Sequence, residues 1–404
     1  MIIRARVVVT MDGAPIDNGA VAVCEDQIAD VGRFDEIRTR NAGEVIDLGE
    51  QALLPGLINA HCHLDYTRLR GKIPPQKSFA DWIRAINAEK VKLSPNDYLA
   101  SINEGFVEAK RFGTTAIANL TAFPELISKI NAPIRTWCFA ELIDVRTPER
   151  ASEIVDRAVE SLRSEANWGL APHALFTASE GLYHRCEQIA HRENVLLSTH
   201  LAESLEEMEM FRYASGPLYE FLKEIGRPMN DCGKSTPLEL FVGALGDRGL
   251  ANWIVAHLNE LTQSDFDLLQ RSARRFHVVH SPRSHSYFKH SRFAFENLRA
   301  LGFKVCLGTD SLASNEDLSL FAEMRRFQNE FSSTSPEEIL EMVTVNPAMA
   351  LRQHKVIGRI RRGFRADLIA VPCSNGNDVF PEIVAFGRQP EWLMVNGNAT
   401  DAIC

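Results

Sequence analysis

The chain has 404 residues, of which 45% are hydrophobic and 24% are charged, as in an ordinary globular protein. Its 44 basic and 53 acidic residues give a formal net charge of −9, and no basic stretch offsets it, which argues against nucleic acid as a partner. No window approaches about 18 consecutive apolar residues, so we expect no membrane span.

Both ends of the chain carry short apolar runs of the kind that form β-strands and hairpins. These runs are Ile2–Thr10, Ala20–Cys24, Ile28–Val31, Ala366–Val371 and Trp392–Val395. We predict that residues 1–54 and 359–404 together form one small β-sandwich domain. Such a pairing would bring the two chain ends close together.

Between these ends, apolar strand-like runs alternate with helical windows such as Pro148–Ala166, Glu180–Glu193 and Ser264–Arg274. The strand candidates are Gly56–Ala60, Thr114–Asn119, Ile134–Ala140, Trp168–Pro172, Val195–Thr199, Trp253–Ala256, His277–Val279 and Val305–Gly308. This alternation predicts a parallel (β/α)₈ barrel over residues 55–358. Residues 204–249 are long for a single connection, and we expect helices and loops there that extend over the barrel mouth.

Five of the predicted strands end in side chains that bind metals or transfer protons. These side chains are His61 and His63, His173, His200, His257 and Asp310, after the first, fourth, fifth, sixth and eighth strands. In this fold the C-terminal ends of the strands meet at one mouth, where active sites are found. We therefore expect these side chains to converge.

A metal site is the first interpretation of this convergence. His61 and His63 are separated by one residue, so both imidazoles face the same side of a strand, about 6–7 Å apart. With His200 and Asp310 they make a set of three imidazoles and one carboxylate, which suits Zn²⁺, with Fe²⁺ as second choice. Such an ion lowers the pKa of bound water to about 7. The predicted fourth strand has no lysine that could bridge two ions, which favours a single ion.

Four residues have two interpretations each. Glu203 either holds a proton for a substrate nitrogen or is a first-turn helix acid. His257 is either a proton acceptor or a hydrogen-bonded core histidine, and the position of His173 favours substrate contact over packing. Asp310 either binds the ion and relays a proton or caps a helix, and joined to the three histidines it favours the ion.

The eight cysteines are scattered and form no CxxC pair, which predicts reduced thiols in a cytoplasmic protein. Cys62 lies between two of the histidines. Because side chains alternate along a strand, we expect it to point away from them and to play no part in the chemistry.

Several motifs together carry a resemblance. They are Leu54–His63, Pro172-His173, His200–Ser204, His257, Gly308–Ser311 and, near the C-terminal end, Gly358–Gly363 with Ala366–Leu368. In this combination the chain resembles the amidohydrolase superfamily over nearly its whole length. It is most similar to the branch of methylthioadenosine/S-adenosylhomocysteine deaminases, aminodeoxyfutalosine deaminases and triazine chlorohydrolases.

The resemblance implies a role for each matching position. One Zn²⁺ or Fe²⁺ would be bound by His61, His63, His200 and Asp310. His257 would activate water together with Asp310, Glu203 would protonate a ring nitrogen, and His173 would contact the substrate. The expected reaction is hydrolytic deamination of a small molecule, an adenine-type nucleoside or a related aminated heterocycle such as 6-aminodeoxyfutalosine. A hydrolytic dechlorinase or a cyclic amidase with the same one-metal site is the alternative.

Two segments depart from the pattern of that branch. Many relatives carry Trp-Pro-x-Glu after the first strand, whereas this chain has Phe79–Ile86, in which Trp82 either stacks on the substrate or packs the loop. After the seventh strand, His285 stands where an asparagine is common. We expect Arg283 and His285 to define the substrate end of the site. Relatives commonly pair, so a homodimer is the expected assembly.

Overall fold

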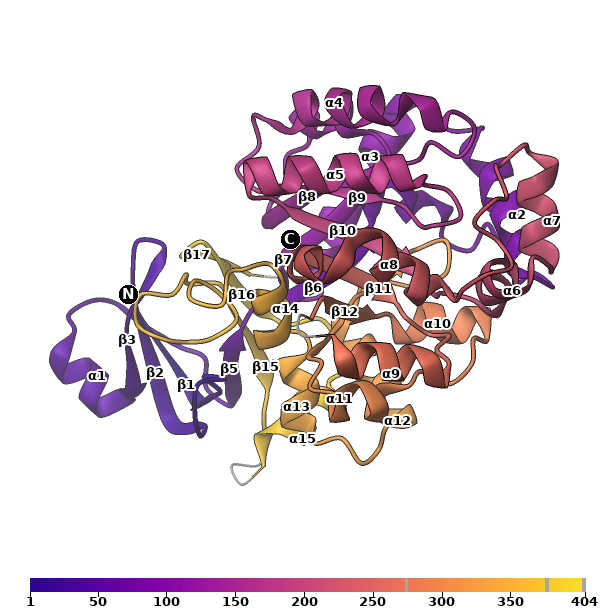
Figure 1. Ribbon diagram of the computed structural model, residues 1–404. Helices are drawn as coiled ribbons and strands as arrows, with labels where there is room; N and C mark the ends of the chain where they lie inside the picture. Colours follow the sequence, from indigo (N-terminus) through magenta and orange to yellow (C-terminus); the bar gives the residue numbers. More distant parts are fainter. Residues whose placement is uncertain (273–274, 375–377, 402–404) are drawn as a thin grey trace.

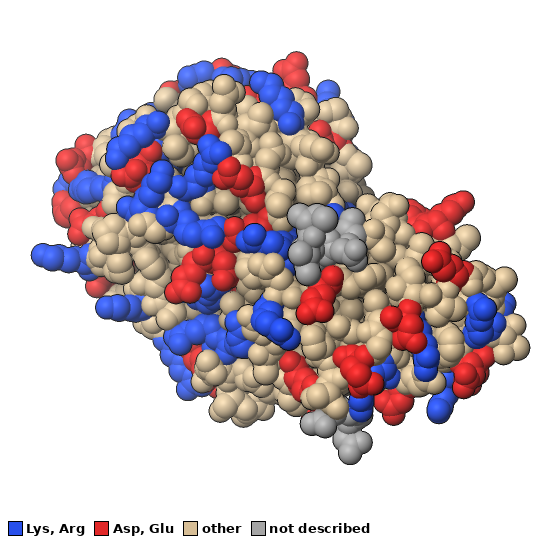
Figure 2. Space-filling view, turned by 180° about the vertical axis from the view of Figure 1, so that it is seen from behind, with Lys and Arg blue, Asp and Glu red and all other residues tan. Residues whose placement is uncertain are grey.

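The structure is a computed structural model that describes residues 1–272, 275–374 and 378–401. Two β-sheets organise it, and Figure 1 shows the smaller sheet beside a larger body in which helices surround the second sheet. Figure 2 views the molecule from behind and shows Lys and Arg interspersed with Asp and Glu over that face. Within the described ranges, no helix has both the length and the apolar character needed to cross a membrane.

The smaller sheet contains strands from both ends of the chain. They are β1 (Ile2–Val8), β2 (Ile16–Cys24), β3 (Gln27–Arg33), β4 (Val45–Asp47), β5 (Gln51–Pro55), β15 (Leu368–Pro372), β16 (Trp392–Val395) and β17 (Asn398–Asp401). Their order is β17-β16-β15-β5-β1-β2-β3, with β4 paired to β1. The antiparallel pairing of β15 with β5 joins the two ends, which confirms the predicted β unit. Strands β4, β5 and β17 were not predicted.

The larger sheet is parallel throughout and forms the barrel. Its strands are β6 (Leu57–His63), β7 (Thr114–Thr121), β8 (Arg135–Leu142), β9 (Trp168–Pro172), β10 (Leu196–Leu201), β11 (Trp253–His257), β12 (His277–His280), β13 (Val305–Leu307) and β14 (Asp310–Ser311). They follow one another in chain order around the sheet, except that β14 pairs with β6. Each strand candidate in residues 55–358 has its counterpart here, which confirms the barrel.

The eighth barrel strand is split into two segments, and this split closes the barrel. β13 pairs with β12 on one side, while β14 pairs with β6 on the other. Gly308 lies between the segments, and a Cβ on it would stand 2.6 Å from the His61 carbonyl oxygen, so only glycine fits. Across the seam, Asn59 Nδ2 donates to Thr309 Oγ1 at 2.8 Å.

Helices surround the barrel and cover its mouth. They are α2 (Phe79–Lys90), α3 (Pro95–Arg111), α4 (Ala151–Leu162), α5 (Glu180–Glu193), α6 (Leu205–Tyr213), α7 (Pro217–Glu224), α8 (Pro237–Gly249), α9 (Gln263–Arg271), α10 (Pro282–Phe288), α11 (Phe295–Ala300), α12 (Leu320–Glu330), α13 (Pro336–Glu341), α14 (Val345–Ala350) and α15 (Val379–Ala385). A further helix, α1 (Phe34–Arg40), packs on β2 and β3 of the smaller sheet (Figure 1). Short 3-10 helices span Leu64–Leu69, Pro124–Lys129, Pro148–Arg150 and Leu250–Asn252.

The long connection between residues 204 and 249 forms α6, α7 and α8, as predicted. In Figure 1, α6 and α7 lie with α2 at one end of the barrel. Their sequence sets their ends: α6 starts after Ser204, whose side chain accepts from Glu207 N, and ends at Ala214 with φ of 51°. The predicted window 264–274 corresponds to α9, although residues 273 and 274 lie outside the described part of the chain.

The barrel interior is filled by apolar side chains below the mouth. Ile58, Phe139 and Ile254 are buried there together with residues of the other strands and of α14. A packed interior of this kind is usual in this fold. The polar side chains at the C-terminal strand ends therefore lie above an apolar core.

Candidate active site

A cavity of about 150 Å³ lies at the C-terminal ends of the barrel strands. The predicted residues on its wall are His63, His173, His200, Glu203, His257, Asp310 and Trp82. His61 lies directly beneath them and is fully buried. The C-terminal ends of five different strands thus bring these residues together.

The four predicted metal ligands converge on one point. One ring nitrogen from each of His61, His63 and His200 lies within 4.8 Å of the others. His63 Nε2 and His200 Nε2 are 3.1 Å apart. Asp310 Oδ1 is 3.9 Å from His61 Nε2 and 3.8 Å from His63 Nε2.

The chemistry of this set fits a divalent metal ion. Both ring nitrogens of His61 and Nδ1 of His63 are buried and have no hydrogen-bond partner in the described residues. Buried polar atoms nearly always have a partner, so these nitrogens require one. Burial also lowers the imidazole pKa of His61, His63 and His200, which keeps the rings neutral, the form that binds metals.

Hydrogen bonds fix two of the four ligands from behind. Asp310 Oδ2 accepts from Ser284 Oγ at 2.7 Å, and its Oδ1 accepts from Ser311 N at 2.8 Å. The Nδ1 of His200 lies 2.8 Å from the His173 carbonyl oxygen, so Nδ1 donates and Nε2 is free to face the site. Asp310 has φ of 54°, a left-handed backbone that is uncommon outside glycine and asparagine.

Glu203 and His257 form a pair beside the predicted metal ligands. Glu203 Oε1 is 3.7 Å from His257 Nε2, and both side chains are buried. Burial, with the nearby carboxyl groups of Asp310 and Glu207, raises the pKa of Glu203 well above its usual range. The pKa of His257 is lowered by burial and by His200. The pair therefore combines a carboxyl group that holds a proton with a neutral imidazole that accepts one.

The backbone of Glu203 is held on both sides. Glu203 N donates to Glu207 Oε2 at 2.7 Å, and the Glu203 carbonyl oxygen accepts from Asn259 Nδ2 at 2.9 Å. Glu207 also accepts from Ala202 N at 3.1 Å, in the turn where Ala202 has φ of 49°. Glu207 lies in an acidic run with Glu206 and Glu209, yet it is fully buried. The two backbone N–H groups that it accepts from explain why this carboxylate is turned inward.

His173 lines the cavity beside the predicted metal ligand His200. Its ring centroid is 4.7 Å from that of His200, and its Nδ1 is 2.6 Å from Thr177 Oγ1. This contact fixes the ring while Nε2 stays available to a molecule in the cavity. The pKa of His173 is lowered by burial, so the ring is neutral.

An aromatic wall faces the metal side of the cavity. Trp82 and Phe79, both on α2, stack with ring centroids 6.1 Å apart, and Phe288 of α10 meets Trp82 edge to face at 4.9 Å. Phe176 completes this wall. Trp82 thus both packs against its neighbours and lines the cavity, so the two sequence interpretations are compatible.

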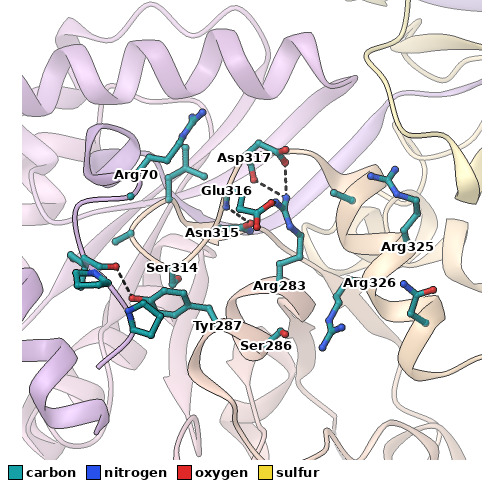
Figure 3. A pocket seen from close by; sticks show the side chains of 18 residues that line it. Arg70, Arg283, Ser286, Tyr287, Ser314, Asn315, Glu316, Asp317, Arg325 and Arg326 are labelled. Carbon is teal, nitrogen blue, oxygen red and sulfur yellow. Dashed lines mark hydrogen bonds and ion pairs between the residues drawn. The ribbon is translucent and has the colours of Figure 1, made fainter. Parts of the chain in front are cut away.

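Arg283 does not line this cavity. It lines a separate pocket of about 910 Å³, where its side chain is turned toward Glu316 and Asp317 (Figure 3). There its guanidinium contacts Asp317 Oδ1 at 2.6 Å and Glu316 Oε2 at 3.0 Å. Its backbone N donates to Glu323 at 2.9 Å.

His285 also lies outside the residues that line the cavity. Its Nε2 is 2.8 Å from the Ser291 carbonyl oxygen, and its ring packs against those of His280 and His290. His280 in turn stacks on Phe293 with centroids 4.0 Å apart. The histidines after the seventh strand therefore support the loop, and Ser284 between Arg283 and His285 is the residue that reaches Asp310.

Glu141 is a wall residue that sequence inspection missed. It stands at the end of β8, is 7% exposed, and lines the cavity together with Tyr66 and Lys90. The rule that found the histidines, a polar side chain at the C-terminal end of a barrel strand, applies equally to Glu141. Cys62 behaves as expected, because its Sγ lies 3.5 Å from the Ala118 carbonyl oxygen of the neighbouring strand.

Comparison with known proteins adds a family. Residues 52–400 match the model of the amidohydrolase family. The chain is 30% identical over 380 residues to a 5-methylthioadenosine/S-adenosylhomocysteine deaminase of Syntrophobacter fumaroxidans, covering 89% of this chain and 81% of that protein.

Solved structures with the same fold span almost the entire chain. The aminofutalosine deaminase of Helicobacter pylori, solved in complex with methylthio-coformycin, is similar with a TM-score of 0.87, 20% identity and 99% coverage of both chains. A zinc-bound adenosine deaminase from Xanthomonas campestris is similar with a TM-score of 0.80, 23% identity, and coverage of 98% of this chain and 92% of that one.

Proposed function

The chain belongs to the amidohydrolase family, and from that premise we propose that it is a metal-dependent deaminase. Its substrate would be an adenine-type nucleoside or a related aminated heterocycle, from which it releases ammonia. The relative from Syntrophobacter fumaroxidans carries the name of an adenine-nucleoside deaminase and aligns with most of this chain. The barrel mouth supplies the groups that such a reaction requires.

One observation carries the proposal. Glu203 and His257 lie 3.7 Å apart on the wall of the same cavity as the imidazoles of His63 and His200. Hydrolytic deamination requires a proton acceptor for the incoming water and a proton donor for the ring nitrogen. A neutral imidazole beside a carboxyl group of raised pKa meets both requirements at neutral pH.

We propose that one ion is held by His61, His63, His200 and Asp310. Three imidazoles and one carboxylate favour Zn²⁺, with Fe²⁺ as second choice. When bound, the ion would supply Lewis-acid activation of a water molecule, whose pKa it lowers to about 7. The zinc in the adenosine deaminase of similar fold agrees with the first choice.

The proton steps use three side chains. Asp310 and His257 accept one proton of the attacking water, His257 at Nε2, and Glu203 delivers its proton to the ring nitrogen beside the carbon that water attacks. The proton taken from water then passes to the exocyclic amine, which leaves as ammonia, and the proton of the new hydroxyl group returns to Glu203. The hydrogen bonds from Ser284 to Asp310 and from Asn259 to the Glu203 backbone hold these groups in place as charge moves.

The remaining wall binds and orients the heterocycle. His173 would contact it through Nε2, since Nδ1 is engaged by Thr177. Trp82, Phe79 and Phe288 offer ring faces and edges on the opposite side. Base–aromatic contacts of this kind contribute about 1–3 kcal/mol to binding. The same rings exclude water from the cavity, which strengthens the electrostatic interactions inside it.

An ammonia-coupled screen tests the proposal. The Zn²⁺-loaded protein is incubated with adenosine, methylthioadenosine, S-adenosylhomocysteine, aminodeoxyfutalosine, guanine and cytosine, and ammonia release is followed. We expect release from at least one adenine-type compound. Chlorotriazines and cyclic amides form the second arm. Hydrolysis of these without ammonia from any aminated heterocycle would overturn the deaminase proposal.

A cytoplasmic location and a homodimer are two smaller proposals. Cys24, Cys62, Cys138, Cys186, Cys232 and Cys306 are free thiols, which agrees with a reducing compartment. Size-exclusion chromatography with light scattering tests the dimer, and fractionation of cells that express the chain tests the location.

A further inference from the structure

The four metal ligands differ in what holds them from behind. Asp310 is held by Ser284 and Ser311, and His200 by the His173 carbonyl oxygen. Metal-binding histidines generally donate their second ring N–H to a carboxylate or a carbonyl group, which fixes both tautomer and orientation. His63 has no such hydrogen bond within the described chain, although its Nδ1 is buried.

Glu141 is the group that faces the back of the His63 ring. Glu141 Oε1 lies 3.5 Å from His63 Nδ1, and both side chains are at most 7% exposed. Glu141 Oε1 is itself buried without a hydrogen-bond partner among the described residues. Two orphaned atoms, one a potential donor and one an acceptor, therefore face each other just beyond ordinary hydrogen-bond distance.

We propose that Glu141 is a positioning residue for His63, accepting a hydrogen bond from its Nδ1–H so that Nε2 stays free for the metal ion. This inference rests on the metal site of the proposed function. His63 Nε2 already faces the partner ligands, at 3.1 Å from His200 Nε2 and 3.8 Å from Asp310 Oδ1. A ring held at Nδ1 can present only Nε2 to that point.

The surroundings of Glu141 support this role over a purely structural one. Burial raises the pKa of Glu141 to about 7, Lys90 acts to lower this pKa, and Asp65 and Asp310 act to raise it. Asp65 is engaged elsewhere, with Thr121 Oγ1 and Ala122 N. Within the described residues Glu141 Oε1 has no hydrogen bond, and it faces the His63 imidazole at 3.5 Å.

Two substitutions separate hydrogen bonding from shape. Glu141→Leu keeps the size but removes the acceptor, whereas Glu141→Gln keeps an acceptor oxygen. We measure the Zn²⁺ dissociation constant of each purified protein by competition with a chelator of known affinity. Glu141→Leu is expected to weaken Zn²⁺ binding by about 10–100-fold, the usual effect of losing such a partner, and Glu141→Gln by clearly less.

Asp144→Asn is the matched control. Asp144 is a buried carboxylate on the same segment, but its partners are the N and Oγ of Ser179, at 2.7 Å and 2.5 Å, and not a metal ligand. This variant should bind Zn²⁺ as the wild type does. Thermal unfolding of the metal-free proteins verifies that each variant is folded.

A second readout does not involve the metal. In the metal-free wild type, ¹⁵N spectra of labelled histidine should show His63 as the Nδ1–H tautomer, and Glu141→Leu should lose that preference. If folded Glu141→Leu keeps both the Zn²⁺ affinity and the His63 tautomer of the wild type, the proposal is overturned. A rise in KM alone, with both of these unchanged, would make Glu141 a substrate contact instead. If the wild type itself fails to bind Zn²⁺, the proposed function fails instead.

Discussion

The metal side of the cavity and the segment after the seventh strand are built in opposite ways. His61, His63 and His200 lie in strands, so the alternation of the strand decides where they point. Arg283, Ser284 and His285 lie in α10, where successive side chains point about 100° apart. Only Ser284 of these three faces Asp310. Histidines and carboxylates at strand ends therefore indicate where a site lies. In a helix, the direction in which each side chain points decides which residues take part in the site.

The largest loss of activity should come from substitution of a strand residue on the metal side of the cavity. His61→Ala removes a ligand that is fully buried in the convergence point. We expect loss of bound metal and a fall in kcat/KM of about 10³-fold or more, since metal activation of water is lost. Metal analysis and ammonia release measure both. His285→Ala is the control from the helix side and should keep metal and activity; full activity of His61→Ala would break the comparison.

Glu203→Gln should give the next largest effect. The amide keeps the shape of the side chain but has no proton to deliver, so kcat should fall by about 10²–10⁴-fold. Zn²⁺ content should stay unchanged, because Glu203 is not among the proposed ligands. A steady-state assay with metal analysis checks this. A fall in metal content as large as the fall in kcat would move Glu203 into the ligand set.

Trp82→Ala tests the aromatic wall. Loss of a ring that faces the heterocycle should raise KM by about 10-fold, as expected from a contact worth roughly 1–3 kcal/mol, with a smaller change in kcat. Trp82→Phe should restore most of the affinity. If Trp82→Ala lowers only the melting temperature and leaves KM unchanged, the ring packs the loop and does not touch substrate.

Arg283→Ala tests the helix side directly. Because its guanidinium contacts Asp317 and Glu316 outside the cavity, kcat/KM should stay within about threefold of the wild type. The free energy of unfolding should fall by about 1–3 kcal/mol, less than for a fully buried ion pair, since Asp317 is partly exposed. Urea unfolding and the ammonia assay measure both. A tenfold loss of kcat/KM would return Arg283 to the substrate end.

The smallest expected effect is a dependence of the free energy of unfolding on pH, and it comes from Glu323. It accepts hydrogen bonds from Asn315 Nδ2 and Arg283 N, and burial raises its pKa to about 8. Between its unfolded value near 4.5 and about 8, the folded state binds the proton more tightly than the unfolded state. Stability therefore falls as pH rises through this window, by at most about 1.4 kcal/mol per pH unit from this one group.

The measurement compares wild type with Glu323→Gln. Urea unfolding at pH 5 and at pH 8 should show a smaller loss of stability for the variant over that interval. An equal loss in both proteins would mean that Glu323 is charged throughout, held so by Arg283.

Much of the fold was predictable because apolar runs and strand ends are local signals. The eight barrel strands and the sheet made from both termini follow from such runs. Strand β17 was missed because Asn398–Asp401 holds one apolar residue, and β4 because its apolar run stops at Asp47 after two residues. β5 was missed because only Gly56 separates it from β6, and only the structure shows that it belongs to the other sheet.

The residues of the candidate site were predictable for the same reason. His61, His63, His200 and Asp310 come together because parallel strands end at one edge. Glu207 illustrates what sequence cannot supply, since only the turn at Ala202 reveals that its carboxylate is turned inward. The roles of the individual site residues stay predictions that the variants above test.

The split eighth strand has a consequence for how the molecule holds together. β14 carries Asp310 and pairs with β6, which carries His61 and His63. A cation shared by these residues would cross-link the first and last strands of the barrel, at a seam where Asn59 meets a residue 250 positions away in sequence. Because the assembled site exists only in the folded chain, the binding free energy of the ion would add to the stability of this seam. Removing the ion should therefore loosen the barrel first along this seam. The seam joins the barrel strand that a ribosome makes first to the one that it makes last.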